Sequence, residues 1–104
     1  MATELRDRCW LSVTGRALGL LAERRGNLKE ALGWLDDACA DPDDNPKICR
    51  WIEVSTLDSI CDISARHRLP RARTMISQLA GISAMAGMPD YLARSRAYAA
   101  RMHR

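Results

Sequence analysis

The chain has 104 residues, 47% of them hydrophobic, and a formal net charge of +3. A chain of this length and composition is expected to fold as one domain over residues 1–104 with a buried core, which excludes an intrinsically disordered protein. No apolar run reaches the about 20 residues of a membrane-spanning helix, and the first residues lack the apolar segment of a signal peptide. We therefore expect a cytoplasmic protein without a membrane partner.

Charge is distributed unevenly along the chain. Residues 1–62 carry eight basic and twelve acidic side chains, whereas residues 63–104 carry eight arginines and one acid, Asp90. Such an imbalance indicates an anionic partner, a head-to-tail contact with a second copy, or a solvated basic face. Arginine outnumbers lysine by 14 to 2 and alanine is abundant, which is typical of bacteria with GC-rich genomes.

The first predicted helix pair covers residues 4–40. A helix over 4–25 precedes a second helix over 28–40 that would pack against it. Gly26 is suited to the left-handed end of the first helix, and Asn27 to the cap of the second, with Glu30 as its capping-box partner. The expected apolar stripe of the first helix consists of Leu5, Cys9, Val13, Ala17 and Leu20 or Leu21.

Small residues recur at helical spacing on both sides of this turn. Gly19 and Ala22 would leave room for Ala31 and Ala38, so that two antiparallel helix backbones can approach closely. The whole pattern comprises Leu18, Gly19, Ala22, Gly26, Ala31, Leu35, Ala38, Asp41 and Pro42. It resembles one tetratricopeptide repeat (TPR), a helix–turn–helix unit of about 34 residues that binds partners and performs no chemistry.

The second predicted pair covers residues 46–87. The run 41–46 holds two prolines and several turn formers, and it marks a break, after which a third helix would begin at Pro46. That helix would reach His67 and pack through Trp51 and several isoleucines. A turn at 67–70 then leads into a fourth helix, with Pro70 in its first turn.

The fourth helix carries a glycine in its interior. Gly81 costs about 1 kcal/mol there relative to alanine, which predicts close packing at this position. The stripe of this helix consists of Ala72, Met75, Ile76, Leu79 and Ile82 or Ser83. After a turn at Gly87, a last helix over 90–102 would cap the array. The turns at Gly26, His67 and Gly87 share a form, since a small or apolar residue follows each by five positions.

Repeats of about 40 residues with long helices resemble the TPR regions of large bacterial signal-responsive ATPase transcription regulators, such as the maltose-operon activator class. The resemblance implies an all-α fold of about five antiparallel helices in a short TPR-like α-solenoid. It also implies a non-catalytic protein- or peptide-binding module, such as the sensor or interaction domain of a bacterial regulator, and the open ends of a short array favour a homodimer. The peptide groove would be lined by Val13, Arg16, Leu20, Glu23 and Arg24 in the first unit and by Leu57, Cys61 and Ser64 in the second.

Two alternative functions stay open. Residues 78–83 are similar to the turn of a DNA-binding helix–turn–helix, and residues 86–94 to the version of that motif in arabinose-operon activators. Contacts to nucleic-acid phosphates would then come from Arg66, Arg68, Arg71, Arg73, Arg94, Arg96 and Arg101. The other alternative is a small TPR-like chaperone or adaptor.

Catalytic and metal sites find little support in the sequence. The two histidines, His67 and His103, stand near no Ser, Cys or carboxylate in a triad arrangement. The four cysteines form no C-x-x-C pair and are expected to be reduced and buried. Residues 41–45 lack the glycine and glutamate of a calcium loop. We therefore expect no enzyme activity, no metal and no cofactor. We expect Trp10, Trp34 and Trp51 to pack between helices in the core or at its edge, with a role as partner anchors as the alternative.

Overall fold

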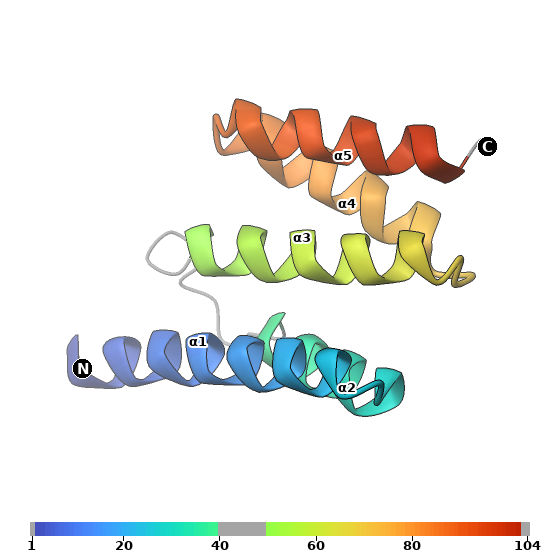
Figure 1. Cartoon of the computed structure of the whole chain (residues 1–104). Helices are drawn as coiled ribbons and strands as arrows, with labels where there is room; N and C mark the ends of the chain where they lie inside the picture. The colour runs from blue at the N-terminus through green and yellow to red at the C-terminus, as the bar shows by residue number, and fades with distance from the viewer. Residues whose placement is uncertain (1, 40–49, 103–104) are drawn as a thin grey trace. The chain divides into compact units, whose positions relative to one another are not determined.

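The computed structural model describes residues 2–39 and 50–102, and within these ranges the fold is all-α with five helices and no strand (Figure 1). The helices are α1 (Ala2–Arg24), α2 (Leu28–Cys39), α3 (Arg50–Arg66), α4 (Ala72–Met85) and α5 (Pro89–Met102). Each predicted helix is confirmed, with ends that differ by two residues or fewer at most of the described termini. The predicted break at 41–46 and the predicted start of the third helix lie outside the described residues.

The chain divides into two compact units, residues 1–56 and residues 57–104. The boundary falls inside α3, between Thr56 and Leu57, and not in a loop. Unit 1 therefore contains α1, α2 and the first turns of α3. Unit 2 contains the remainder of α3 together with α4 and α5.

In unit 1, α1 and α2 pack side by side as an antiparallel hairpin (Figure 1). A Cβ atom built on Gly15 would lie 3.2 Å from the Ala38 Cβ, and one built on Gly19 would lie 3.0 Å from the Ala31 carbonyl oxygen. Contact therefore moves backward along α2 as it moves forward along α1. The predicted close approach at Gly19 and Ala31 is confirmed, and Gly15 adds a second point of approach that the sequence pattern left out.

Over the side chains that the structure describes, the predicted apolar stripe of α1 is correct only in part, because Val13 and Leu20 are half-buried and two other members are not. Ala17 and Leu21 are exposed, whereas Gly15, Gly19 and Ala22 are buried against α2. On α2 the predicted contact residues Ala31 and Leu35 are fully buried. The smallest side chains of α1, and not its leucines, face the partner helix because they let the two backbones come close.

The turn between α1 and α2 has the predicted left-handed glycine, with φ of +81° at Gly26. The Asn27 N–H donates to the Ala22 carbonyl at 2.9 Å and the Gly26 N–H donates to the Glu23 carbonyl at 3.0 Å, the two bonds of a Schellman motif. Asn27 Oδ1 accepts from the Glu30 N–H at 3.3 Å, as a cap should. Glu30 differs from a capping-box residue because its carboxylate accepts from the Asn27 side-chain amide.

The same turn recurs twice in unit 2. The Leu69 N–H donates to the Ser64 carbonyl and the Met88 N–H donates to the Ser83 carbonyl, both at 2.9 Å. The left-handed residue is Gly87 in one turn and Arg68, with φ of +52°, in the other. The sequence prediction that centred this turn on His67 is therefore wrong by one residue.

Two further predictions for α4 are corrected. Pro70 lies in the turn before the helix, because α4 begins only at Ala72. Residues 78–83 are helical, so they do not form the turn of a helix–turn–helix.

The core face of α4 agrees with the predicted stripe, since Ala72, Ile76, Leu79 and Ser83 are buried. Gly81 contradicts its prediction of close packing. A Cβ atom built there would meet nothing within 4 Å. The cost of this glycine to the helix is therefore not offset by a close approach among the described residues.

Candidate functional site

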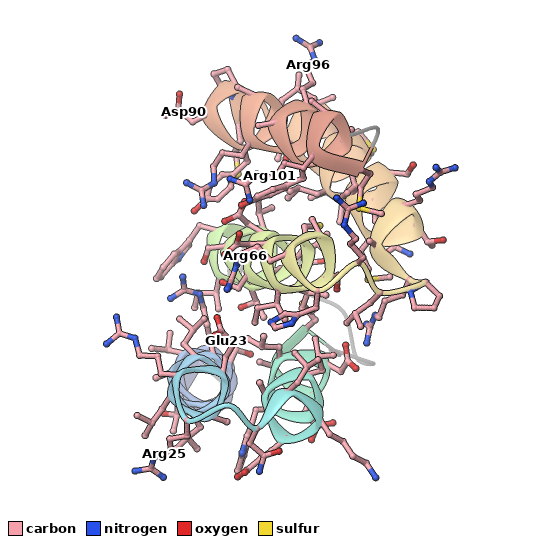
Figure 2. All side chains as sticks on the ribbon, turned by 45° about the vertical axis from the view of Figure 1, so that its right-hand side comes forward. Glu23, Arg25, Arg66, Asp90, Arg96 and Arg101 are labelled. Atoms are coloured by element: carbon pink, nitrogen blue, oxygen red, sulfur yellow. The ribbon has the colours of Figure 1, made fainter. Side chains whose placement is uncertain are left out.

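The groove residues predicted on α1 share one side of the helix. Val13, Arg16, Leu20 and Glu23 follow one another at spacings of three or four, which places them along one face. All four are half-buried, and Arg24 beside them is exposed. Figure 2 shows Glu23 and Arg25 pointing to opposite sides of α1. This set of four residues is called the Arg16 face below.

Arg16 provides the chemical feature of this face. Its Nε atom is shielded from solvent and has no hydrogen-bond partner among the described residues. A buried donor without an acceptor costs about 1–3 kcal/mol, and more when the group is charged. A guanidinium binds a carboxylate with two parallel hydrogen bonds. The Arg16 face therefore carries an unsatisfied cationic donor at a position between the apolar residues Val13 and Leu20.

The groove residues predicted for the second repeat are in a different environment. Leu57, Cys61 and Ser64 are all buried in the part of α3 that belongs to unit 2. The Ser64 Oγ is buried without a hydrogen-bond partner among the described residues. The thiol of Cys61 is fully buried, as expected for a cysteine that behaves as a small hydrophobe. These three side chains form core and offer no open lining.

Unit 2 contains a polar cluster that the sequence patterns did not reveal. Asp58 on α3 receives the Arg94 guanidinium of α5 in a bidentate pair, with Nε–Oδ1 and Nη2–Oδ2 distances of 2.8 Å. The Tyr98 hydroxyl donates to the same Asp58 Oδ1 at 2.7 Å. Arg94 Nη2 also donates to the Tyr98 oxygen at 3.1 Å. Asp58 and Tyr98 are buried, and Arg94 reaches them from a more exposed position.

The environment of this cluster raises the pKa of both Tyr98 and Arg94. Burial, reinforced by the hydrogen bond to Asp58, raises the pKa of Tyr98 well above its usual value. The hydrogen bond to Asp58 raises the pKa of Arg94, so that this guanidinium stays charged. Asp58 accepts hydrogen bonds from two nitrogens of Arg94 and from the Tyr98 hydroxyl. We interpret the cluster as a link between α3 and α5.

A second aspartate on α3 engages two further arginines. Arg66 Nη2 lies 3.2 Å from Asp62 Oδ2, and Arg101 Nη1 lies 3.5 Å from Asp62 Oδ1. The Arg101 guanidinium also lies over the Tyr98 ring, 5.7 Å from its centroid. Exposed pairs of this kind contribute little to stability. However, these two ion pairs place the Asp62 carboxylate against Arg66 and Arg101, which are then less available to bind phosphate.

The seven arginines proposed for nucleic-acid contact are thus in different situations. Arg66, Arg94 and Arg101 hold aspartates, and Arg71 Nη2 lies 3.6 Å from the Met75 sulfur. Arg68 occupies the left-handed turn position. Arg73 and Arg96 are exposed, and Figure 2 shows Arg96 pointing away from the helices of unit 2. Unit 2 as a whole holds eight arginines and three aspartates.

Large apolar side chains are exposed mainly on unit 1. Trp51 is 60% exposed, so the prediction that it packs between helices is wrong, whereas the 38% exposure of Trp34 agrees with packing at an edge. The side chain of Trp10 lies outside those that the structure describes. Leu18 and Leu21 on α1 are 37% and 44% exposed. Exposed side chains of this size that lie together mark interaction surfaces.

Among residues whose side chains are described, no group of three His, Cys, Asp or Glu is placed to hold a metal ion. None of the described helices is both long and apolar enough to cross a bilayer.

Comparison with known proteins adds no relative. No protein-family model matches the chain, and neither curated proteins nor solved structures give a match.

Proposed function

We propose that the chain is a non-catalytic module that binds a protein or peptide segment through the Arg16 face, with its helices stacked as a short TPR-like array. The observation that carries the proposal is the buried Arg16 Nε without a partner among the described residues. A carboxylate from a bound segment would satisfy that donor, and Val13 and Leu20 would receive apolar side chains beside it. Such a module suits the sensor or interaction domain of a regulator.

Three local features support the TPR-like part of the proposal. The hairpin of α1 and α2 is joined by a glycine turn, and its helices touch through Gly15, Gly19 and Ala31. The same Schellman turn ends α3 and α4. Repeated helix pairs with equivalent turns are the building units of helical repeat proteins.

The test is a peptide selection followed by measured affinities. A random peptide display library is selected on the wild-type chain, and enriched peptides are titrated by fluorescence anisotropy. We expect enriched peptides to carry an acidic residue next to an apolar one. Arg16→Gln should weaken their binding about tenfold, as expected when a charge-assisted hydrogen bond is lost.

Arg25→Gln is the matched control, because Arg25 is on the same hairpin but points to the other side of α1 (Figure 2). It should leave the affinity unchanged, and circular dichroism should show equal helicity for all three proteins. Selection without enrichment, or equal losses for the two variants, would contradict the proposal.

Binding to nucleic acid is a weaker candidate. Three of the seven arginines already hold aspartates. The remaining exposed arginines provide fewer phosphate contacts than the sequence count indicates, and affinity for a phosphate backbone rises with that number.

A further inference from the structure

Unit 1 has a second surface, formed by Leu18 and Leu21 of α1 and Trp34 of α2, which we call the outer face. All three side chains are at least 37% exposed. The Trp34 indole N–H is 3.5 Å from Glu30 Oε1, so the ring has a polar partner for its only donor. The rest of the indole is apolar surface in contact with solvent.

The helix geometry places these residues on the same side of the hairpin. Leu18 follows Gly15 by three positions, and Trp34 follows Ala31 by three, where Gly15 and Ala31 both lie on the line of contact between the helices. Each is therefore rotated about 60° from that line, in the same sense about its own axis. Because the two axes are antiparallel, both rotations lead to the same side.

The outer face is separate from the Arg16 face. At 100° per residue, Leu18 and Leu21 lie about 140–160° around α1 from Arg16 and Glu23. Figure 2 shows Arg25 and Glu23 on opposite sides of α1. Arg25 follows Ala22 by three positions, so it borders the outer face at the turn end of the hairpin.

Two exposed side chains of opposite charge lie at the two ends of the outer face. Arg25 lies at the turn end, near Glu30, whose carboxylate accepts from the Asn27 amide and faces the Trp34 indole N–H, and Asp37 lies at the other end, three residues beyond Trp34. Asp37 is beside Ala38, which contacts Gly15. At 1.5 Å per residue, Arg25 and Asp37 are therefore about 14 Å apart along the hairpin, with Leu18 and Leu21 between them.

A surface with an apolar centre, the cation Arg25 at one end and the anion Asp37 at the other can pair with a second copy of itself after a half-turn. We propose that the outer face is the interface of a two-fold symmetric homodimer, in which Arg25 of each chain meets Asp37 of its partner. Residue pairs in such an interface occur twice, related by the symmetry axis. The axis passes between Leu18 and Leu21, and the Trp34 rings cover the leucines of the opposite hairpin.

The interface is small. Three apolar side chains and two charge pairs cover less than the roughly 800 Å² per partner of a standard interface. The dimer should therefore dissociate on dilution. Sedimentation velocity of the full chain, from micromolar to near-millimolar concentration, should show a reversible monomer–dimer equilibrium.

Two substitutions test the apolar centre. Leu18→Glu should abolish the dimer, because it buries a charge without a partner. Met85→Glu is the control, since Met85 is 90% exposed and belongs to unit 2, and it should leave the dimer unchanged. Circular dichroism checks that both variants keep their helices. A wild-type chain that stays monomeric throughout, or a Leu18→Glu chain that still dimerises, would overturn the proposal.

A charge exchange tests the symmetry. Arg25→Asp alone gives two Asp–Asp contacts in the dimer, and Asp37→Arg alone gives two Arg–Arg contacts, so each should weaken it about tenfold. An equimolar mixture of the two variants makes both contacts attractive and should form heterodimers with an affinity close to that of the wild type. A mixture that associates no better than its components would rule out this arrangement. Arg16→Gln should leave sedimentation unaltered, which separates this proposal from the peptide-binding function.

Discussion

Gly19 and Leu35 lie so close together that only glycine, which has no Cβ, fits at position 19. A Cβ atom built on Gly19 would lie 2.8 Å from Leu35 Cγ and 3.0 Å from the Ala31 carbonyl oxygen. The first neighbour is the branch point of a buried side chain and the second is backbone. Neither can move away without separating α1 from α2.

Gly19→Ala should therefore destabilise unit 1. Overpacking of this kind costs about 1–3 kcal/mol, and the better helix propensity of alanine returns about 1 kcal/mol of it. We expect a net loss of up to about 2 kcal/mol in the free energy of unfolding. All three tryptophans are in residues 1–56, so urea denaturation followed by tryptophan fluorescence reports this unit. Gly33→Ala is the matched control, because its Cβ would meet nothing within 4 Å, and it should raise stability.

Gly81→Ala should stabilise unit 2. The glycine is in the interior of α4 and has open space where a Cβ would be. Replacing it removes backbone entropy from the unfolded chain, which is worth about 1 kcal/mol. Both tyrosines are in residues 57–104, so the near-ultraviolet dichroism and absorbance of tyrosine follow this unit. A loss of stability would indicate a close neighbour at this position in solution.

Arg68→Gly should also stabilise unit 2. Arg68 has a φ of +52°, a left-handed conformation that costs an ordinary residue about 1–2 kcal/mol. Glycine adopts it without that cost but loses more entropy on folding, so we expect a net gain of about 0.5–1 kcal/mol. Gly87→Ala places the same strain into the equivalent turn after α4 and should destabilise by a similar amount. Equal stability of the Arg68→Gly variant and the wild type in urea denaturation would argue against this turn geometry.

Tyr98→Phe should lower stability at neutral pH by about 1–2 kcal/mol, since Asp58 loses a buried donor. The variant should also change the pH dependence. The pKa of Tyr98 is raised above its usual value of 10.0, so its contribution is complete below pH 10 and is lost as the pH rises further. The wild type should therefore lose stability above about pH 10 more steeply than the variant. Parallel curves from urea denaturation between pH 8 and pH 11 would show that Tyr98 does not titrate in this way.

The helices and two of the three turns could be predicted because their signals are local. Gly26 and Gly87 are the residues that a left-handed helix end prefers, and Asn27 is a typical cap. The Arg68 turn was placed one residue early because arginine carries no such preference. On α1 the spacing of small residues correctly indicated the contact at Gly19, whereas the apolar period wrongly placed Ala17 in the buried stripe.

The cluster around Asp58 could not be predicted, for a different reason. Arg94 and Tyr98 lie 36 and 40 residues from Asp58, and helical periodicity carries no information over such separations. From the sequence, Arg94 was therefore predicted to be a free surface charge, whereas in the fold it is paired with Asp58. The exposure of Trp34 and Trp51 is similarly a property of tertiary structure, because composition alone favours burial of tryptophan.

The shared helix has a consequence for how the protein can be taken apart. The border between the units cuts α3 between Thr56 and Leu57, whereas many multidomain proteins are joined by a dispensable linker. Truncation at this border would split the seventeen residues of α3 into two fragments, each too short to form a stable helix by itself. Neither unit is therefore expected to fold when expressed alone. Unfolding of one unit should fray the end of α3 that belongs to the other.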